Sequence, residues 1–274
     1  MQSFSLSFDK RFELEVNKRR VSLAPLGFAE GGVISSRSIM LPELTALLAV
    51  APKGADAATF KHLAVDEDAL HKASAANRLK TFNKLRLLYG LNPALPIFRE
   101  FRRLNLLFPA ELPRLAGLLT FAREPLLRSC ADMVIGTPIG ARLGRADFEQ
   151  WIREFAPGRY SKTMYRSFSH NLYASFFQLG YLGTALGKCR LRQRLVVRPA
   201  SAAFAAFLDW FTGLNGLSLL QGRYSSTLEL VKADHLALLT AAGQLGLMRV
   251  AHAGGVLHLD FASWLQAGEA RLSP

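Results

Sequence analysis

Eight basic side chains and no acidic ones lie between Phe155 and Leu208, and this imbalance is the clearest chemical signal in the chain. The eight are Arg159, Lys162, Arg166, Lys188, Arg190, Arg192, Arg194 and Arg198. Lysine and arginine donate charge-assisted hydrogen bonds to phosphate oxygens, and arginine also makes paired hydrogen bonds to the edge of guanine. Because no carboxylate competes for these cations, the segment predicts a surface that binds a polyanion.

The first half of this segment predicts a helix from Lys162 to Leu179, with Ser161 as its N-cap. Its apolar residues recur at three- and four-residue steps and form one stripe: Met164, Phe168, Leu172, Phe176 and Leu179. The opposite face carries the side chains that we expect to contact nucleic acid: Lys162, Arg166, Ser169, His170 and Tyr173. We expect the helix to end at Gly180.

The second half predicts a basic strand from Lys188 to Arg198, after a turn rich in glycine. A period of two places Arg190, Arg192 and Arg194 on one face of that strand. Upstream, 145–155 predicts a short amphipathic helix. Helix, turn, basic helix and basic hairpin is the order of a winged helix-turn-helix, a module that binds nucleic acid. The expected contacts from the hairpin are Lys188, Arg190, Arg192, Arg194 and Arg198.

The composition of the whole chain agrees with a polyanionic partner. The 274 residues carry a net charge of +13, and half of them are hydrophobic, enough for a large core. Nucleic acid is favoured over a membrane surface, because the basic residues lie on apolar-patterned segments rather than in a tail. Residues 1–20 show no secretion signal, and the apolar run at 199–220 predicts a buried helix and a turn rather than a membrane span. Two cysteines without disulfide or metal spacing suit a cytoplasmic protein.

The rest of the chain predicts a mainly α-helical protein. Phe4 to Phe8 and Phe12 to Val16 alternate as a short hairpin would. Helical spacing follows at 40–50, 69–89, 97–107, 112–121 and 126–134. The acidic run at 66–68 is interpreted as the N-terminal cap of the second of these helices. Its outer face suggests a secondary basic surface, or simply solvated charge: Lys72, Arg78, Lys80 and Lys84.

After a buried helix at 201–211, the tail predicts a second winged-helix-like module. A helix at 234–245 precedes two apolar runs around Gly254-Gly255, a typical hairpin turn. The region is nearly neutral, so we interpret it as a packing or dimerisation module. The expected domains are 1–144 (helical bundle with a short hairpin), 145–200 (basic winged helix-turn-helix) and 201–274 (C-terminal module).

No residue pattern in the chain predicts an enzyme, a cofactor or a metal site. The segment from Gly183 to Cys189 has three residues between its glycines and a cysteine after the lysine, whereas a phosphate-binding loop has four residues and a serine or threonine. The six histidines form no pair on one helical face, and paired carboxylates are absent from the segments that resemble a cleft.

Several short motifs resemble the BrxA family, a component of bacterial BREX phage-exclusion systems. They extend from residue 28 to residue 208: Phe28-Ala-Glu-Gly-Gly-Val-Ile, Leu41-Pro-Glu-Leu, Leu70-His-Lys-Ala-Ser with the Arg-rich helix after it, Tyr160-Ser-Lys-Thr, Asn171-Leu, Leu179-Gly-Tyr-Leu, Leu191-Arg-Gln and Val197-Arg-Pro. The resemblance implies a helical, non-enzymatic protein with a helix-turn-helix that binds DNA within a defence system that also holds a methyltransferase and an ATPase. A likeness to RNA-binding antitermination proteins of NusB type is a second suggestion.

The leading hypothesis is a non-catalytic antiviral-defence protein that binds double-stranded DNA. In it Lys162, Arg166 and His170 enter a groove while the arginines of the hairpin hold phosphates. One alternative is an adaptor that organises other defence-system proteins and uses its basic face to dock an acidic partner. Another is an RNA-binding protein that stacks bases on Tyr160, Tyr165 or Tyr173, although we interpret these tyrosines first as half-buried core residues.

Overall fold

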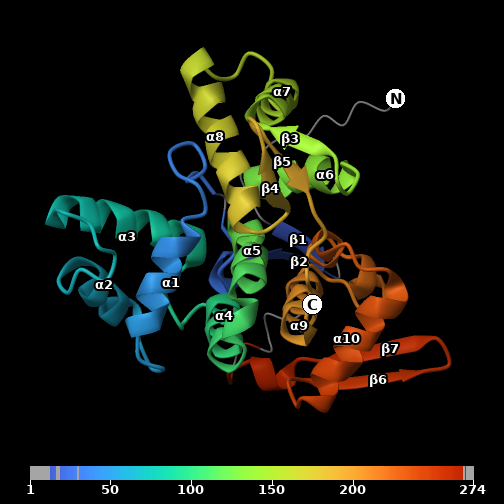
Figure 1. The fold of residues 1–274 in the computed structure, drawn as a ribbon. Coiled ribbons are helices and arrows are strands. Elements are labelled where there is room, and N and C mark those ends of the chain that lie inside the picture. Colours follow the sequence, from blue (N-terminus) through green and yellow to red (C-terminus); the bar gives the residue numbers. More distant parts are fainter. Residues whose placement is uncertain (1–12, 17–18, 30, 268, 270–274) are drawn as a thin grey trace.

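The computed structural model describes residues 13–16, 19–29, 31–267 and 269, which form a mainly helical protein (Figure 1). The N-terminal part contains α1 (Leu41–Val50), α2 (Ala57–Val65), α3 (Ala75–Tyr89), α4 (Pro96–Leu107), α5 (Leu112–Arg123) and α6 (Pro125–Gly136). A central unit follows, with β3 (Arg142–Gly144), α7 (Arg145–Phe155), α8 (Lys162–Gln178), β4 (Leu182–Leu186) and β5 (Cys189–Arg192). The C-terminal part contains α9 (Pro199–Phe211), α10 (Lys232–Gln244), β6 (Arg249–Ala253) and β7 (Val256–Asp260).

Four of the N-terminal helices lie where the apolar spacing predicts them, and the region around α2 and α3 does not. α2 has no counterpart among the expected helices, and α3 begins at Ala75 rather than at 69. Its cap is Ser74, whose hydroxyl accepts the Asn77 backbone N–H at 3.3 Å. The interpretation of the acidic run as a cap is therefore wrong. Asp66 ends α2 instead, and its carboxylate lies 2.9 Å from His62 Nδ1 on the last turn.

The expected N-terminal hairpin is only partly within the described chain. Its first strand, Phe4 to Phe8, lies outside the described residues. β1 (Glu13–Val16), which overlaps the second expected strand, pairs antiparallel with β2 (Arg19–Ser22).

Two helices from distant parts of the sequence form the centre of the core. α5 is buried along almost its whole length, and so is α9, which lies beside it (Figure 1). The alanines of α9 allow this close approach, while Phe204, Phe207 and Phe211 fill the space around it. This confirms the expected buried helix. Among the described helices, none has both the length and the apolar character needed to cross a bilayer.

The central unit places α7 and α8 on a small antiparallel sheet. The strand order is β3-β5-β4, so the strand before α7 pairs with the strand that follows the β4–β5 hairpin turn. α8 ends at Gln178, and Gly180, just beyond the C-cap Leu179, has a positive φ of 80° that suits glycine. The hairpin turns at Gly187 and Lys188, again with a positive φ at the glycine. The strand expected from Lys188 to Arg198 is therefore shorter than predicted and ends at Arg192.

The C-terminal part confirms the expected helix and hairpin. α10 packs on α9, and β6 pairs with β7 around Gly254-Gly255, with Ala253 opposite Val256. Figure 1 shows this hairpin at the end of the molecule away from α7 and α8.

Candidate nucleic-acid interface

α8 is held by an apolar stripe that packs against α7. Ser161 caps the helix as predicted, and its hydroxyl accepts the Met164 backbone N–H at 3.3 Å. Phe168, Leu172 and Phe176 are buried, and the Phe176 ring lies 5.8 Å from that of Phe148 on α7. Met164 is the exception to the predicted stripe: 41% of its surface is exposed, because it lies in the first turn of α8.

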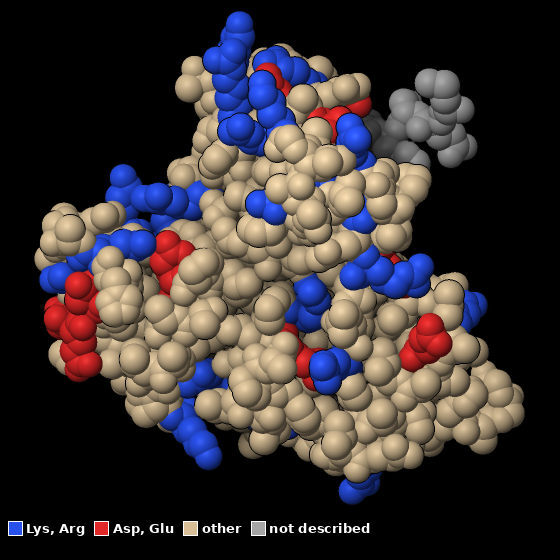
Figure 2. All heavy atoms as spheres, in the orientation of Figure 1, with Lys and Arg blue, Asp and Glu red and all other residues tan. Residues whose placement is uncertain are grey.

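Three of the predicted side chains form a line along the exposed side of α8. Lys162, Arg166 and His170 are exposed and lie four residues apart, so they are stacked one turn above another. None of them forms an ion pair with a described residue. Figure 2 shows the Lys and Arg side chains over this helix. The line therefore faces away from the core.

Two other predicted contacts on α8 are displaced from that line by packing. Ser169 is buried, and its hydroxyl donates a hydrogen bond to the Arg166 carbonyl oxygen at 3.0 Å. Tyr173 is half-buried and meets the ring of Phe148 edge-on at 5.8 Å. The exposed strip is narrower than the polar face because α7 covers one side of α8 and residues 33–38 cover the other. The prediction that Ser169 faces outward is wrong.

The β4–β5 hairpin presents a smaller set of cations than the sequence predicts. Lys188 at its tip is exposed, as are Arg194 and Arg198 in the segment that follows β5. Arg190 is half-buried: its guanidinium lies 3.6 Å from the centre of the Phe177 ring and donates to the Gly183 carbonyl oxygen at 2.8 Å. This contact fixes the hairpin against the last turns of α8.

Arg192 is a structural residue rather than an exposed contact. It is 1% exposed, its Nε donates to the Val134 carbonyl oxygen at 2.8 Å, and its guanidinium is paired with the Glu229 carboxylate. The period of two correctly places Arg190 and Arg192 on the same face of β5. That face is open near the turn, whereas α6 and residue 229 cover its other end, where Arg192 lies. Arg192 therefore cannot contact phosphate, and the prediction that it does is wrong.

The secondary basic surface, before and along α3, also divides into paired and free charges. Lys72 pairs with Glu43 at 3.1 Å, between Nζ and Oε1. Arg78 donates to the Val65 carbonyl oxygen at 2.7 Å and lies 3.6 Å from Asp68. Lys80 is exposed and Lys84 is partly exposed. Lys72 and Arg78 therefore hold α1, α2 and α3 together, whereas Lys80 and Lys84 remain available.

The tyrosines that the RNA-binding alternative would use for stacking pack within the protein, in agreement with their interpretation as partly buried core residues. Tyr165 is buried, and its hydroxyl donates to the Ala156 carbonyl oxygen at 2.5 Å. Tyr160 packs on Phe168, with ring centres 4.8 Å apart, and Tyr173 packs on Phe148. Their rings are partly or wholly committed to the core around α8.

The sequence pattern does not predict that one basic residue, Arg37, belongs to this surface. Arg37 is exposed in the loop that crosses α8, between serines that predict only a turn. Its position depends on contacts of high sequence separation: Asn171 Nδ2 donates to the Ile34 carbonyl oxygen at 2.8 Å, and Ser167 Oγ to that of Ser35 at 2.8 Å. An alternating or helical pattern of apolar residues does not indicate contacts between residues so far apart in the sequence.

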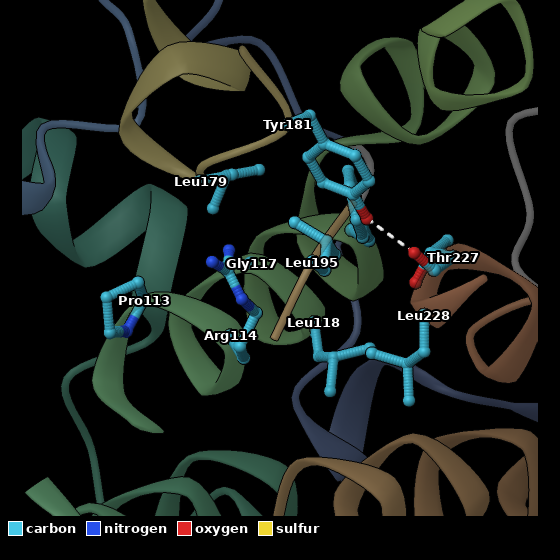
Figure 3. Close-up of a pocket in the computed structure, with 10 residues that line it drawn as sticks. Pro113, Arg114, Gly117, Leu118, Leu179, Tyr181, Leu195, Thr227 and Leu228 are labelled. Atoms are coloured by element: carbon cyan, nitrogen blue, oxygen red, sulfur yellow. Dashed lines mark hydrogen bonds between the residues drawn. The ribbon is translucent and has the colours of Figure 1, made fainter. Parts of the chain in front are cut away.

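A small crevice lies where α5 meets the central and C-terminal parts (Figure 3). Tyr181 donates its hydroxyl to the Thr227 carbonyl oxygen at 2.6 Å, and burial raises the pKa of this tyrosine. Burial also lowers the pKa of Arg114, whose Nε donates to the Val196 carbonyl oxygen at 3.4 Å. The space has room for about one water molecule, too little for a substrate. In the part of the chain that the structure describes, no group of His, Cys, Asp or Glu could hold a metal ion.

No protein-family model matches the chain, and no curated protein sequence is significantly similar to it.

Proposed function

We propose that this chain is a non-catalytic protein that binds duplex DNA through its central unit. The observation that carries the proposal is the line of Lys162, Arg166 and His170 on the exposed side of α8, beside a hairpin with exposed cations. The segment from 155 to 208 contains no acidic residue to oppose phosphate. Unpaired cations in this number on a folded surface favour a polyanion as the partner.

The order of elements supports a winged helix-turn-helix. α7, a short turn and α8 precede the β4–β5 hairpin, and β3 pairs with β5 across the same sheet. In this arrangement α8 is the recognition helix and the hairpin is the wing. Lys162 to His170 spans roughly 12 Å along the helix axis, comparable to the width of the major groove. Arg166 lies at the middle of the line, where a guanine edge would be within reach.

The wing would contact the phosphate backbone. Lys188 occupies its tip, and the Arg190 contact with Phe177 keeps the hairpin beside α8. Arg194 and Arg198 follow on the exposed segment. Phosphate contacts of this kind fix the register of a protein on DNA without reading its sequence.

The proposed role is in bacterial phage defence, in a BREX-like system. It rests on the resemblance of residues 28–208 to the BrxA family. The proposed domains are 1–144, 145–200 and 201–274, the last a second winged-helix-like module that packs rather than binds DNA. Two features support a packing role for the C-terminal module: it lacks net positive charge, and α10 packs against α9.

The test is a binding assay with one sequence presented as duplex DNA, single-stranded DNA and structured RNA, at about 50 and about 200 mM salt. Wild type is compared with Lys162→Ala/Arg166→Ala and with a charge-matched control, Lys232→Ala/Arg249→Ala, which changes exposed residues of the C-terminal part. We expect salt-sensitive duplex binding that falls at least tenfold in the α8 variant and not in the control.

Other outcomes favour the alternatives. Tighter binding to structured RNA than to duplex would replace the DNA proposal with the RNA-binding one. Absence of binding to all three would favour the adaptor, and a pull-down that retains its partner proteins after nuclease treatment would then support that function.

A further inference from the structure

We propose that Arg37 and α3 form a second phosphate-binding surface, the α3 arm, which contacts the same duplex as α8. The arm consists of Arg37, Lys80 and Lys84. The inference rests on the proposed function and extends it: the protein would cover more duplex than the helix and wing of the central unit alone.

The first observation is that some basic side chains of this region form ion pairs within the protein and others do not. Lys72 and Arg78 are used within the N-terminal helices, as their contacts with Glu43 and Asp68 show. Lys80 and Lys84 lie one turn apart on α3, where Lys80 is exposed and Lys84, beside the buried face, is partly exposed. No acidic side chain among the described residues pairs with either of them or with Arg37.

The second observation is that Arg37 is held beside the recognition helix. The two hydrogen bonds from Asn171 and Ser167 fix Ile34 and Ser35 against the middle of α8, next to Arg166. Two residues of chain reach at most about 7 Å, so Arg37 cannot lie far from that helix. Ile39 is fixed in turn, because its backbone N–H donates to Ser175 Oγ at 3.1 Å.

The third observation is that the same loop is fastened to α3. The Tyr89 hydroxyl at the end of α3 donates to the Ile39 carbonyl oxygen at 2.6 Å. Lys84 precedes Tyr89 by five residues, roughly 7.5 Å along the helix axis. On its other side the loop is anchored by Glu124, whose carboxylate accepts the Val33 backbone N–H at 2.9 Å. α8, the loop and α3 are therefore joined by buried hydrogen bonds rather than by a free linker.

The fourth observation is the distribution of charge on one face of the molecule. Figure 2 shows Lys and Arg side chains over α8 and over α3. Asp and Glu gather at the outer end of that region, by α2, and a smaller acidic patch lies between α3 and the centre of the molecule. Asp66 and Glu67, which are exposed at the end of α2, mark where a phosphate backbone would no longer be attracted. A duplex lying on α8 can thus continue along the arm until it reaches α2.

The experiment measures Kd against duplex length, from about 10 to about 25 base pairs, at several salt concentrations. The arm variant is Arg37→Ala/Lys80→Ala/Lys84→Ala, and its charge-matched control is Lys53→Ala/Lys232→Ala/Arg249→Ala, all exposed residues elsewhere. Each phosphate contact contributes about 0.9 to the slope of log K against log salt, so the arm variant should lose roughly 2.7 from that slope on long duplexes. On the shortest duplex it should bind as wild type does.

The outcomes separate this inference from the proposed function. Equal affinity and slope for the arm variant and wild type on long duplexes, with binding still lost in Lys162→Ala/Arg166→Ala, would overturn the arm and leave the DNA-binding function intact. No duplex binding by wild type would remove both. A length-dependent loss confined to the arm variant supports the arm, provided that circular dichroism shows the same thermal transition as wild type.

Discussion

Arg192 stabilises the fold and is not available to bind a partner, although it lies in a basic segment. Its guanidinium is buried between α6 and Glu229, so Arg192→Ala removes one partner of a buried ion pair and leaves the carboxylate without compensation. Such a loss costs about 3 kcal/mol in the free energy of unfolding. Urea denaturation should show that decrease. Arg194→Ala, which changes an exposed residue two positions later, is the control and should unfold as wild type does.

On α8, an exposed residue, Arg166, and a buried one, Ser169, should differ in their effect on duplex binding. Arg166→Ala removes an exposed guanidinium from the centre of the line and should weaken duplex binding by about 2 kcal/mol, a roughly 30-fold higher Kd. Ser169→Ala removes only a hydroxyl that bonds to the Arg166 carbonyl oxygen, and should leave Kd within about twofold of wild type. Titration of a labelled duplex with both variants distinguishes them, and equal losses would contradict this assignment of the exposed line.

Residue types and spacing were enough to predict that Lys162, Arg166 and His170 lie exposed on one face of α8, because a helical period indicates directly which side chains share a face. The same reasoning was wrong for Ser169 and Arg192. Their burial is imposed by α7, α6 and residue 229, elements whose placement depends on the whole fold. Arg37 was not predicted for the same reason.

At the scale of elements, helices with a regular apolar stripe were predictable and short elements were not. α4, α5 and α6 each begin with a proline in the first turn and follow the apolar spacing, which makes their limits visible in the sequence. β3 has three residues, too few for an alternation, and exists through pairing with β5. Its pairing, which completes the sheet beside α8, could be seen only in the structure.

The wing should affect affinity without affecting sequence preference. Lys188→Ala/Arg194→Ala removes two exposed cations from the hairpin and the segment after it. If each contacts one phosphate, the slope of log K against log salt should fall by about 1.8, and affinity should fall equally for unrelated duplexes. Binding to two duplexes of different sequence over a salt series measures both effects. A loss confined to one sequence would mean that the wing reads bases.

At the scale of the whole molecule, polar groups buried around α9 make stability depend on pH in two opposing ways. Asp209 accepts the backbone N–H groups of Tyr224 and Ser225 at 3.0 and 2.7 Å, and burial raises its pKa from 3.8 to about 6. The folded state therefore binds this proton more tightly than the unfolded state. Between those two values, the contribution of Asp209 to stability falls as the pH rises.

His235 has the opposite effect, and substitution can isolate it. The side chain is buried on α10, and neither ring nitrogen forms a hydrogen bond of good geometry, although the carbonyl groups of Leu220 and Ala202 lie nearby. Burial lowers the pKa of the imidazole below 6.5, and the carbonyl groups of Leu220 and Ala202 only partly oppose that shift. The unfolded state binds the proton more tightly, so its contribution to stability is lost as the pH falls below about 6.5.

His235→Leu removes the titrating group and should abolish that loss, while Asp209 contributes equally to both proteins. Urea midpoints at about pH 7.5 and about pH 5.5 should therefore show the variant gaining stability relative to wild type at the lower pH. His258→Gln, an exposed histidine on β7, is the control and should keep the wild-type dependence. A constant difference between His235→Leu and wild type at both values would mean that the imidazole stays neutral throughout this range.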